Sequence, residues 1–194
     1  MPEPSHFFAC LARMKYIGRW GVMRNTRNEN IQEHSLQAAM IAHGLALISR
    51  EVFGRPVDAE RVMALAVFHE VSEIFTGDLP SPIKHHDPAL RSAYGRIEEG
   101  ARQRLFRMLP GELRDAYRPL LMAGGEDEQT RLVKAADKIC AYLKCLEEMK
   151  SGNEEFARAK ETLEAEIEAL DLPEVAWFME RFAAGFSLTL DELS

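Results

Sequence analysis

The chain has 194 residues, of which 46% are hydrophobic and 28% are charged, and its formal net charge at pH 7 is -7. This length suits one domain with a substantial core, and the composition is ordinary for a globular protein, which argues against disorder and against a membrane protein. The negative charge argues against a general nucleic-acid surface, because such surfaces are normally strongly basic. We therefore predict a single domain over residues 1–194 that binds neither a nucleic acid polymer nor a membrane.

The cysteines and the first residues indicate the compartment. Cys10, Cys140 and Cys145 are odd in number and form no CxxC pair, so free thiols are expected rather than disulfides. The segment 1–5 lacks the basic start and the apolar stretch of a signal peptide, and no apolar run is long enough to cross a bilayer. We predict a cytoplasmic protein.

The predicted elements are helices, taken from the spacing of apolar residues and from capping signals. The first covers residues 7–17 and ends at Gly18, and a polar, irregular segment follows over residues 19–30. The second runs from Glu33 to about Arg50. Its broad apolar face is expected to be buried and is formed by Leu36, Ala39, Met40, His43, Leu47 and Ile48.

The third helix is expected from Asp58 to Phe75, with Asp58 as its cap and Gly77 as its stop signal. A stiff, proline-containing loop should follow over residues 78–82. Further helices are expected near residues 88–108, 111–122, 127–150, 153–170 and 174–185. The sequence therefore predicts an all-α protein.

The third predicted helix places an imidazole and two carboxylates, His69, Glu70 and Glu73, after an apolar run. A buried carboxylate without a partner is costly, so such groups normally pair, become neutral or bind a cation. In a continuous helix, residues three or four apart share a face, so Glu73 would lie beside both His69 and Glu70. The pattern predicts a metal or catalytic site. The alternative is a hydrogen-bonded structural histidine with carboxylates that face water, and spacing alone leaves both open.

A metal site would need donors from other helices. The candidates are His34, within the second helix, and Asp137, which follows two small alanines in an apolar helical pattern. Two imidazoles and two carboxylates suit manganese, iron, cobalt, nickel or zinc better than calcium.

The series His34, His69-Glu70 and Asp137 resembles the metal signature of the HD-domain phosphohydrolases. More narrowly, the chain resembles bacterial HD-domain 5′-deoxynucleotidases in the segments 5–9, 19–20, 23–25, 33–37, 76–80 and 140–148, and the similarity extends to residues 187–192. This resemblance implies an HD-domain helical bundle that forms a homodimer. It also implies hydrolysis of deoxyribonucleoside 5′-monophosphates to deoxyribonucleoside and phosphate, with a divalent metal cation as cofactor.

The resemblance also implies residue roles. The metal would be held by His34, His69, Glu70 and Asp137, and the same resemblance puts His34, Glu70 and Asp137 beside the substrate. The catalytic residues would be Glu73, which acts on the attacking water or the leaving oxygen, with Asp78 and Arg19. Arg19 would orient the phosphate and Trp20 would pack on the sugar. The nucleotide would be enclosed by Asp78, Leu79, Pro80 and Ser81.

Elementary chemistry agrees with these roles, although each residue has a plainer interpretation. An arginine fork suits a phosphate, and an apolar wall at the ribose 2′ position would reject a hydroxyl group. Alternatively, Arg19 is a surface cation, Trp20 fills the core and Asp78 is a turn residue.

The main departure from the family pattern is Glu70, which stands where that pattern has Asp. One extra methylene moves a carboxylate by about a carbon–carbon bond length, which is large against the ~0.2 Å tolerance of metal-ligand distances. We predict retained metal binding that is weaker or differently selective. Two other functions stay open: another HD phosphohydrolase, acting on a related nucleotide or a phosphodiester, and a nucleotide-binding or scaffold protein in which Glu70 has abolished turnover.

Overall fold

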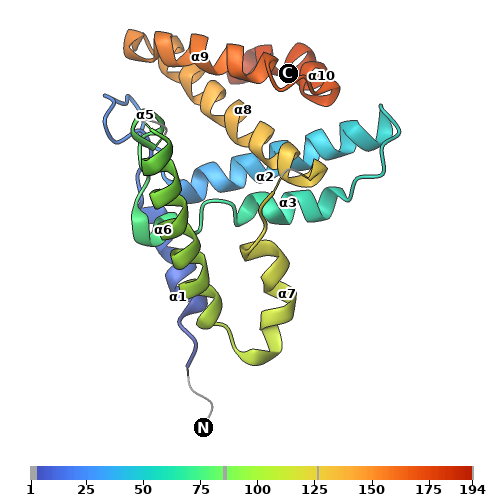
Figure 1. Ribbon diagram of the computed structural model, residues 1–194. Helices are drawn as coiled ribbons and strands as arrows, with labels where there is room; N and C mark the ends of the chain where they lie inside the picture. Colours follow the sequence, from blue (N-terminus) through green and yellow to red (C-terminus); the bar gives the residue numbers. More distant parts are fainter. Residues whose placement is uncertain (1–3, 85–86, 126, 194) are drawn as a thin grey trace.

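The computed structural model describes residues 4–84, 87–125 and 127–193, and these ranges contain helices and no β-strand (Figure 1). Gly18 and Asn30 form one isolated antiparallel β-bridge at the two ends of the irregular segment. The all-α prediction is confirmed. The helices are α1 (Phe7–Leu11), α2 (Ile31–Glu51), α3 (Ala59–Val67), α4 (Glu73–Thr76), α5 (Ser81–Lys84), α6 (Pro88–Arg107), α7 (Gly111–Leu121), α8 (Glu128–Lys150), α9 (Ala157–Glu168) and α10 (Pro173–Phe182).

Short 3-10 turns extend several of these helices, at Ala12–Tyr16, Glu154–Phe156, Ala183–Ser187 and Leu190–Glu192. Within the described ranges, none of the helices has the length and apolar character that a membrane crossing requires.

The centre of the molecule is formed by α2, α3 and α8, which pack against one another, and α9 and α10 cover one end of this layer (Figure 1). Small side chains allow the close approach, because Ala38, Ala42 and Ala46 recur every fourth residue on α2 and are fully buried. A second hydrophobic cluster lies between α1, α6 and α7. The His34 position on α2 falls between the two clusters, since Ile31 belongs to the second and Ala38 to the first.

The predicted buried face of α2 is partly wrong. Leu36 and Met40 are 57% and 63% exposed, and Met63 on α3 is 39% exposed, whereas the alanine face is buried. Bulky apolar residues would hold α3 and α8 further away, so the small residues face the core and the large ones point outward. This arrangement leaves an apolar surface on α2 and α3.

The predicted third helix is also shorter than expected. Its cap is confirmed, because Asp58 Oδ1 accepts a hydrogen bond from the Arg61 amide. However, α3 ends at Val67, residues 68–72 form turns, and α4 is a single helical turn that ends at Gly77, where φ is 70°. The His69 side chain competes with the helix, since its Nδ1 donates to the Ala66 carbonyl at 2.6 Å, the carbonyl that a continuing helix would use.

Candidate active site

Three separate parts of the fold bring their polar side chains to one place. His34 comes from α2, His69 and Glu70 from the turns after α3, and Asp137 from α8. Each offers one nitrogen or carboxylate oxygen, and these four atoms all lie within 4.8 Å of one another. The donors predicted from the sequence therefore lie together in the structure, although the continuous helix expected to carry two of them is interrupted.

The individual distances show a close cluster. His34 Nε2 lies 2.9 Å from Asp137 Oδ1, and 3.7 Å from Glu70 Oε1. His69 Nε2 lies 3.8 Å from Glu70 Oε1 and 3.9 Å from Asp137 Oδ1. The two imidazole rings are 5.4 Å apart between centroids.

The hydrogen bonding of this cluster fits a metal ion. His69 Nδ1 donates to the Ala66 carbonyl, so the neutral ring presents an unprotonated Nε2 to the other three residues. That Nε2 and Glu70 Oε2 are buried, and neither has a hydrogen-bond partner among the described residues. Buried polar atoms are rarely left unpaired, and this mixture of imidazole and carboxylate donors suits a divalent transition-metal cation.

Arg19 lies directly against the cluster and is not a surface cation. Its Nη1 is 2.5 Å from Glu70 Oε1, its Nη2 is 3.9 Å from Asp137 Oδ1, and its Nε is 3.3 Å from Glu29 Oε2. Burial alone would lower the pKa of this guanidinium, but the three carboxylates outweigh burial and raise the pKa. Sequence analysis missed Glu29, whose position in an irregular segment gives no periodic signal.

Two further carboxyl groups, Glu73 and Asp78, lie near the cluster. Glu73 is the first residue of α4 and is buried, and burial together with the charges of Glu70 and Asp78 raises its pKa to about 9. Burial also raises the pKa of Asp78, whose Oδ2 accepts a hydrogen bond from the Trp20 amide at 3.2 Å. Leu79 and Pro80 follow Asp78 and are partly buried, and Ser81 begins α5 at the surface.

Trp20 has an unusual backbone conformation for a large side chain, with φ at 58°. Its ring packs on Phe156 with the centroids 5.3 Å apart, and its buried Nε1 has no hydrogen-bond partner among the described residues. The contact with Phe156 shows that Trp20 is partly a packing residue, as the plainer interpretation of the sequence proposed.

A cavity of about 340 Å³ opens at the cluster, and its walls include His69, Glu70, Glu73 and Asp137. Basic side chains that sequence analysis did not single out line the same cavity, namely Lys84, Arg102 and Lys134. Lys84 Nζ is held 2.6 Å from Glu98 Oε1 and lies over the Tyr94 ring. A cavity with candidate metal donors in its wall and basic side chains around it suits an anionic ligand.

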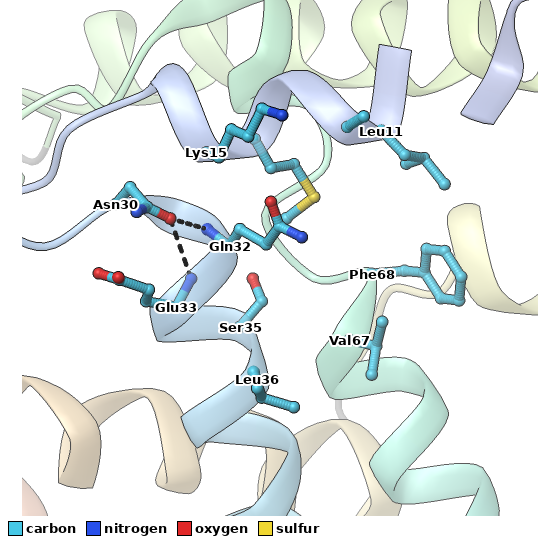
Figure 2. Close-up of a pocket in the computed structure, with 11 residues that line it drawn as sticks. Leu11, Lys15, Asn30, Gln32, Glu33, Ser35, Leu36, Val67 and Phe68 are labelled. Carbon is cyan, nitrogen blue, oxygen red and sulfur yellow. Dashed lines mark hydrogen bonds between the residues drawn. The ribbon is translucent and has the colours of Figure 1, made fainter. Parts of the chain in front are cut away.

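A larger cavity, of about 570 Å³, lies between the 3-10 turn after α1, the start of α2 and the end of α3 (Figure 2). Leu11, Leu36, Val67 and Phe68 border it, and Asn30 caps α2 at its edge through bonds to the Gln32 and Glu33 amides, as Figure 2 shows. None of the four clustered donors lines this apolar groove.

Known proteins closely resemble this chain in sequence. Residues 6–186 match the family model described as 5′-deoxynucleotidase YfbR-like. The chain is 50% identical over 193 residues to a 5′-deoxynucleotidase of Vibrio cholerae serotype O1, an alignment that covers 99% of this chain and 100% of the relative. It is 52% identical over 193 residues to the 5′-deoxynucleotidase YfbR of Escherichia coli K12/DH10B, with coverages of 99% and 97%.

Solved structures share the fold at lower identity. An HD-domain phosphohydrolase from Listeria innocua matches with a TM-score of 0.82 at 23% identity, over 93% of this chain and 88% of that one. The HD phosphohydrolase of cyanophage S-2L, bound to dA and one catalytic Zn²⁺ ion, matches with a TM-score of 0.66 at 20% identity, over 95% and 98%. The fold is thus the HD-domain helical bundle, and by its full-length sequence similarity the chain belongs to the YfbR-like family of 5′-deoxynucleotidases.

Proposed function

We propose that this protein, as one domain, uses a divalent metal ion to hydrolyse deoxyribonucleoside 5′-monophosphates to deoxyribonucleoside and inorganic phosphate. The observation that carries the proposal is the convergence of the four donor atoms with Arg19 against them, beside a cavity whose walls include three of those donors and three basic side chains. The full-length relatives named 5′-deoxynucleotidase support the reaction and its substrate class.

In this proposal the metal ligands are His34, His69, Glu70 and Asp137. A bound divalent ion lowers the pKa of water and offsets negative charge on phosphoryl oxygens. The zinc ion of the cyanophage relative supports the divalent class, and the donor set is equally suited to cobalt, manganese, nickel or iron.

We assign the phosphate to Arg19, because a guanidinium fork can donate two parallel hydrogen bonds to phosphoryl oxygens. Glu73 is assigned to the leaving group. A carboxyl group whose pKa is about 9 keeps its proton at neutral pH, so it can give that proton to the departing 5′ oxygen of the deoxyribose. Asp78 holds the Trp20 amide, and in this proposal it also orients the nucleotide.

Trp20 is assigned to the sugar, and Asp78, Leu79, Pro80 and Ser81 to the loop that encloses the nucleotide. The indole packs on Phe156 and is therefore a rigid wall. A rigid apolar wall at the 2′ position disfavours a ribose, because the additional hydroxyl group would clash or lose its hydrogen bonds. His34, Glu70 and Asp137 would then border both metal and substrate.

We also propose that the protein is a cytoplasmic homodimer. Leu36 on α2 and Val67 on α3 are exposed apolar residues that line the groove of Figure 2, and the exposed Met40 and Met63 lie one turn away on the same two helices; we call these four residues the apolar patch. The same groove is bordered by Lys15 and Glu33, so an isologous contact centred on this groove can pair the lysine of one copy with the glutamate of the other. The three free cysteines agree with a reducing compartment.

The experiment that tests the function measures phosphate release from deoxyribonucleoside and ribonucleoside 5′-monophosphates. Release from dAMP should require a divalent ion, should stop with a chelator and should be lost in His34→Ala and Asp137→Ala. Lys160→Ala, which changes a lysine that pairs with Glu164 on α9, is the control and should keep wild-type activity. Release that is insensitive to the chelator, or activity only toward phosphodiesters such as cyclic dinucleotides, would contradict the proposal.

Sugar discrimination is tested separately. The wild-type protein should prefer dAMP to AMP, and Trp20→Ala should reduce that preference, whereas Trp177→Phe should not. Equal turnover of dAMP and AMP by the wild-type protein, unchanged in Trp20→Ala, would remove the assigned role of Trp20.

A further inference from the structure

The irregular segment 19–30 carries Arg19 and Trp20, but it has no helix or strand to fix its conformation. Backbone hydrogen bonds hold its two ends together, from the Arg19 amide to the Glu29 carbonyl at 2.9 Å and from the Ile31 amide to the Ile17 carbonyl at 3.0 Å. The middle of the segment has no such backbone partner among the described residues outside itself. It is held by side chains from α8 and from the 3-10 turn after α8.

Glu148 on α8 is the centre of this attachment, and it is 1% exposed. Its Oε2 accepts hydrogen bonds from the Thr26 amide at 2.8 Å, from the Thr26 hydroxyl at 2.7 Å and from Asn153 Nδ2 at 2.8 Å. Its Oε1 accepts from the Arg27 amide at 3.2 Å and from Lys144 Nζ. One carboxylate therefore holds two consecutive backbone amides of the segment.

Lys144 completes the cluster from one turn earlier on α8, and it is 5% exposed. Its Nζ also donates to the Arg27 carbonyl at 2.6 Å, and Asn153 Nδ2 donates to the Arg24 carbonyl at 2.7 Å. A buried ion pair is often no more stable than well-packed apolar residues would be, so its presence is weak evidence of a role in overall stability. Its hydrogen bonds go to segment 24–27, which is consistent with a role in placing that segment.

The same segment fixes Trp20. Asn25 Nδ2 donates to the Trp20 carbonyl at 3.2 Å, and the Met23 amide donates to the same carbonyl at 2.9 Å. On the other side, the Trp20 ring packs on Phe156, which lies beneath the Lys144 ammonium, 5.8 Å from Nζ to the ring centroid. These contacts connect the Glu148 cluster to the positive φ of Trp20, a conformation that persists only where its surroundings enforce it.

We propose that Glu148, together with Lys144, is a positioning residue that holds segment 24–27 and thereby sets Trp20 for the nucleotide. The inference rests on the role proposed above for Trp20. Glu148 is not one of the four clustered donors and follows Asp137 on α8 by 11 residues, which is roughly 16 Å along a helix. Its replacement should therefore affect nucleotide binding and leave the metal site intact.

The test compares Glu148→Gln with Glu147→Gln, a substitution of the neighbouring exposed glutamate, in the Trp177→Phe background where Trp20 is the only tryptophan. In Glu148→Gln we expect KM for dAMP to rise by about tenfold, with a smaller change in kcat, since hydrogen bonds to a buried charge are among the stronger ones. Metal content per chain should stay at the wild-type value. Trp20 emission should shift to longer wavelength, and Glu147→Gln should show none of these changes.

Two further variants distinguish a local loss of the attachment from unfolding of the whole protein. Thr26→Val removes only the hydroxyl donor and should move KM and emission in the same direction by a smaller amount, and Glu148→Asp should restore part of the wild-type KM. Limited trypsin digestion should cut after Arg24 and Arg27 sooner in Glu148→Gln than in the wild-type protein. Digestion and emission do not depend on turnover, so they test the attachment even if the proposed reaction fails. Wild-type KM, emission and digestion in Glu148→Gln would overturn the inference.

Discussion

At position 70 the longer glutamate side chain reaches two kinds of partner. Glu70 Oε1 lies 2.5 Å from Arg19 Nη1 and within 3.8 Å of both imidazoles, while its Oε2 has no partner among the described residues. The extra methylene therefore leaves the Glu70 carboxylate within the donor cluster and also places this carboxylate against the Arg19 guanidinium.

We expect Glu70→Asp to change metal affinity or metal preference, because a shorter carboxylate retreats from Arg19 and meets the ion at a different distance. Competition titrations with a chromogenic chelator for cobalt, manganese and zinc measure the change, alongside phosphate release. Identical metal binding and identical turnover in both proteins would show that the length of this side chain is immaterial.

Glu148 gives a prediction about pH. Burial alone would raise its pKa, but the hydrogen bonds from Lys144, Asn153 and Thr26 lower the pKa well below the ordinary value of 4.5. The contribution of ionised Glu148 to the free energy of unfolding is therefore fully present above pH 4.5. It is lost as the pH falls toward the lowered pKa that Glu148 has in the folded protein.

At pH 7, Glu148→Gln should reduce the free energy of unfolding by about 1–3 kcal/mol, the usual range for hydrogen bonds to a charged group. The difference from the wild-type protein should shrink below pH 4.5. Urea unfolding in the presence of a chelator measures this difference at each pH. Glu147→Gln is the control, and its difference from the wild-type protein should not change with pH. A difference that does not change with pH would mean that the charge of Glu148 is unimportant for stability.

At the scale of elements, the break between α3 and α4 shapes the site. Residues 68–72 leave the helix, and Gly77 ends α4 with φ 70° and ψ 168°, a region that is essentially restricted to glycine. Its carbonyl accepts hydrogen bonds from the Thr76 and Tyr94 hydroxyls, and Asp78 follows at once. The conformation of Gly77 therefore decides where Asp78 lies.

Gly77→Ala should lower the free energy of unfolding by about 1–3 kcal/mol and should also reduce phosphate release, because the backbone must shift beside Asp78. Gly100→Ala in the exposed middle of α6 is the matched control, and it should be neutral or stabilising by up to about 1 kcal/mol. Thermal melts and activity assays compare the two. Equal changes in stability and in phosphate release for both substitutions would argue against a role for Gly77 in placing Asp78.

The helices were predictable from the sequence where apolar periodicity coincided with a cap, as at Asp58 and in the long α6 and α8. The end of α3 was not predictable, because the His69 imidazole donates to a helical carbonyl and apolar periodicity does not reveal that competition. The buried face of α2 was not predictable either, since alanines give a weak hydrophobic signal although they permit the closest packing.

The chemistry of the sequence suggested the candidate site, because histidines and carboxylates are uncommon on apolar helical faces, but spacing alone left a structural histidine open and the family resemblance favoured the metal site. The charged residues that surround the site could not be recognised from the sequence. Glu29, Lys84 and Glu148 are ordinary charged residues in the sequence, and only the tertiary packing brings them to Arg19, to the cavity and to segment 24–27. Contacts between distant polar residues leave no periodic trace in a single sequence.

At the scale of the whole molecule, the apolar patch on α2 and α3 gives a prediction about assembly. A stable interface covers about 800 Å² on each partner, and introduced charge at its centre should prevent association. The double substitution Leu36→Lys and Met40→Lys should convert a dimer into a 22.0 kDa monomer, measured by light scattering after size exclusion. Val22→Lys, at another exposed apolar position, is the control.

The monomeric variant should still release phosphate, because the four donors and Arg19 all belong to one chain. A wild-type protein that is already monomeric at micromolar concentration would refute the homodimer.

The attachment of segment 24–27 to α8 places the residue proposed to contact the sugar on a different part of the fold from the candidate metal donors. The four candidate metal donors come from α2, from the turns after α3 and from α8, whereas Trp20 belongs to a loop that Glu148, Lys144 and Asn153 attach to the C-terminal part of α8 and the turn after it. Given the role proposed above for Trp20, we expect substitutions in this loop to alter which nucleotides are accepted more than they alter metal binding. For engineering, that makes the stretch between Gly21 and Asn28 a promising place to look for new substrate preferences.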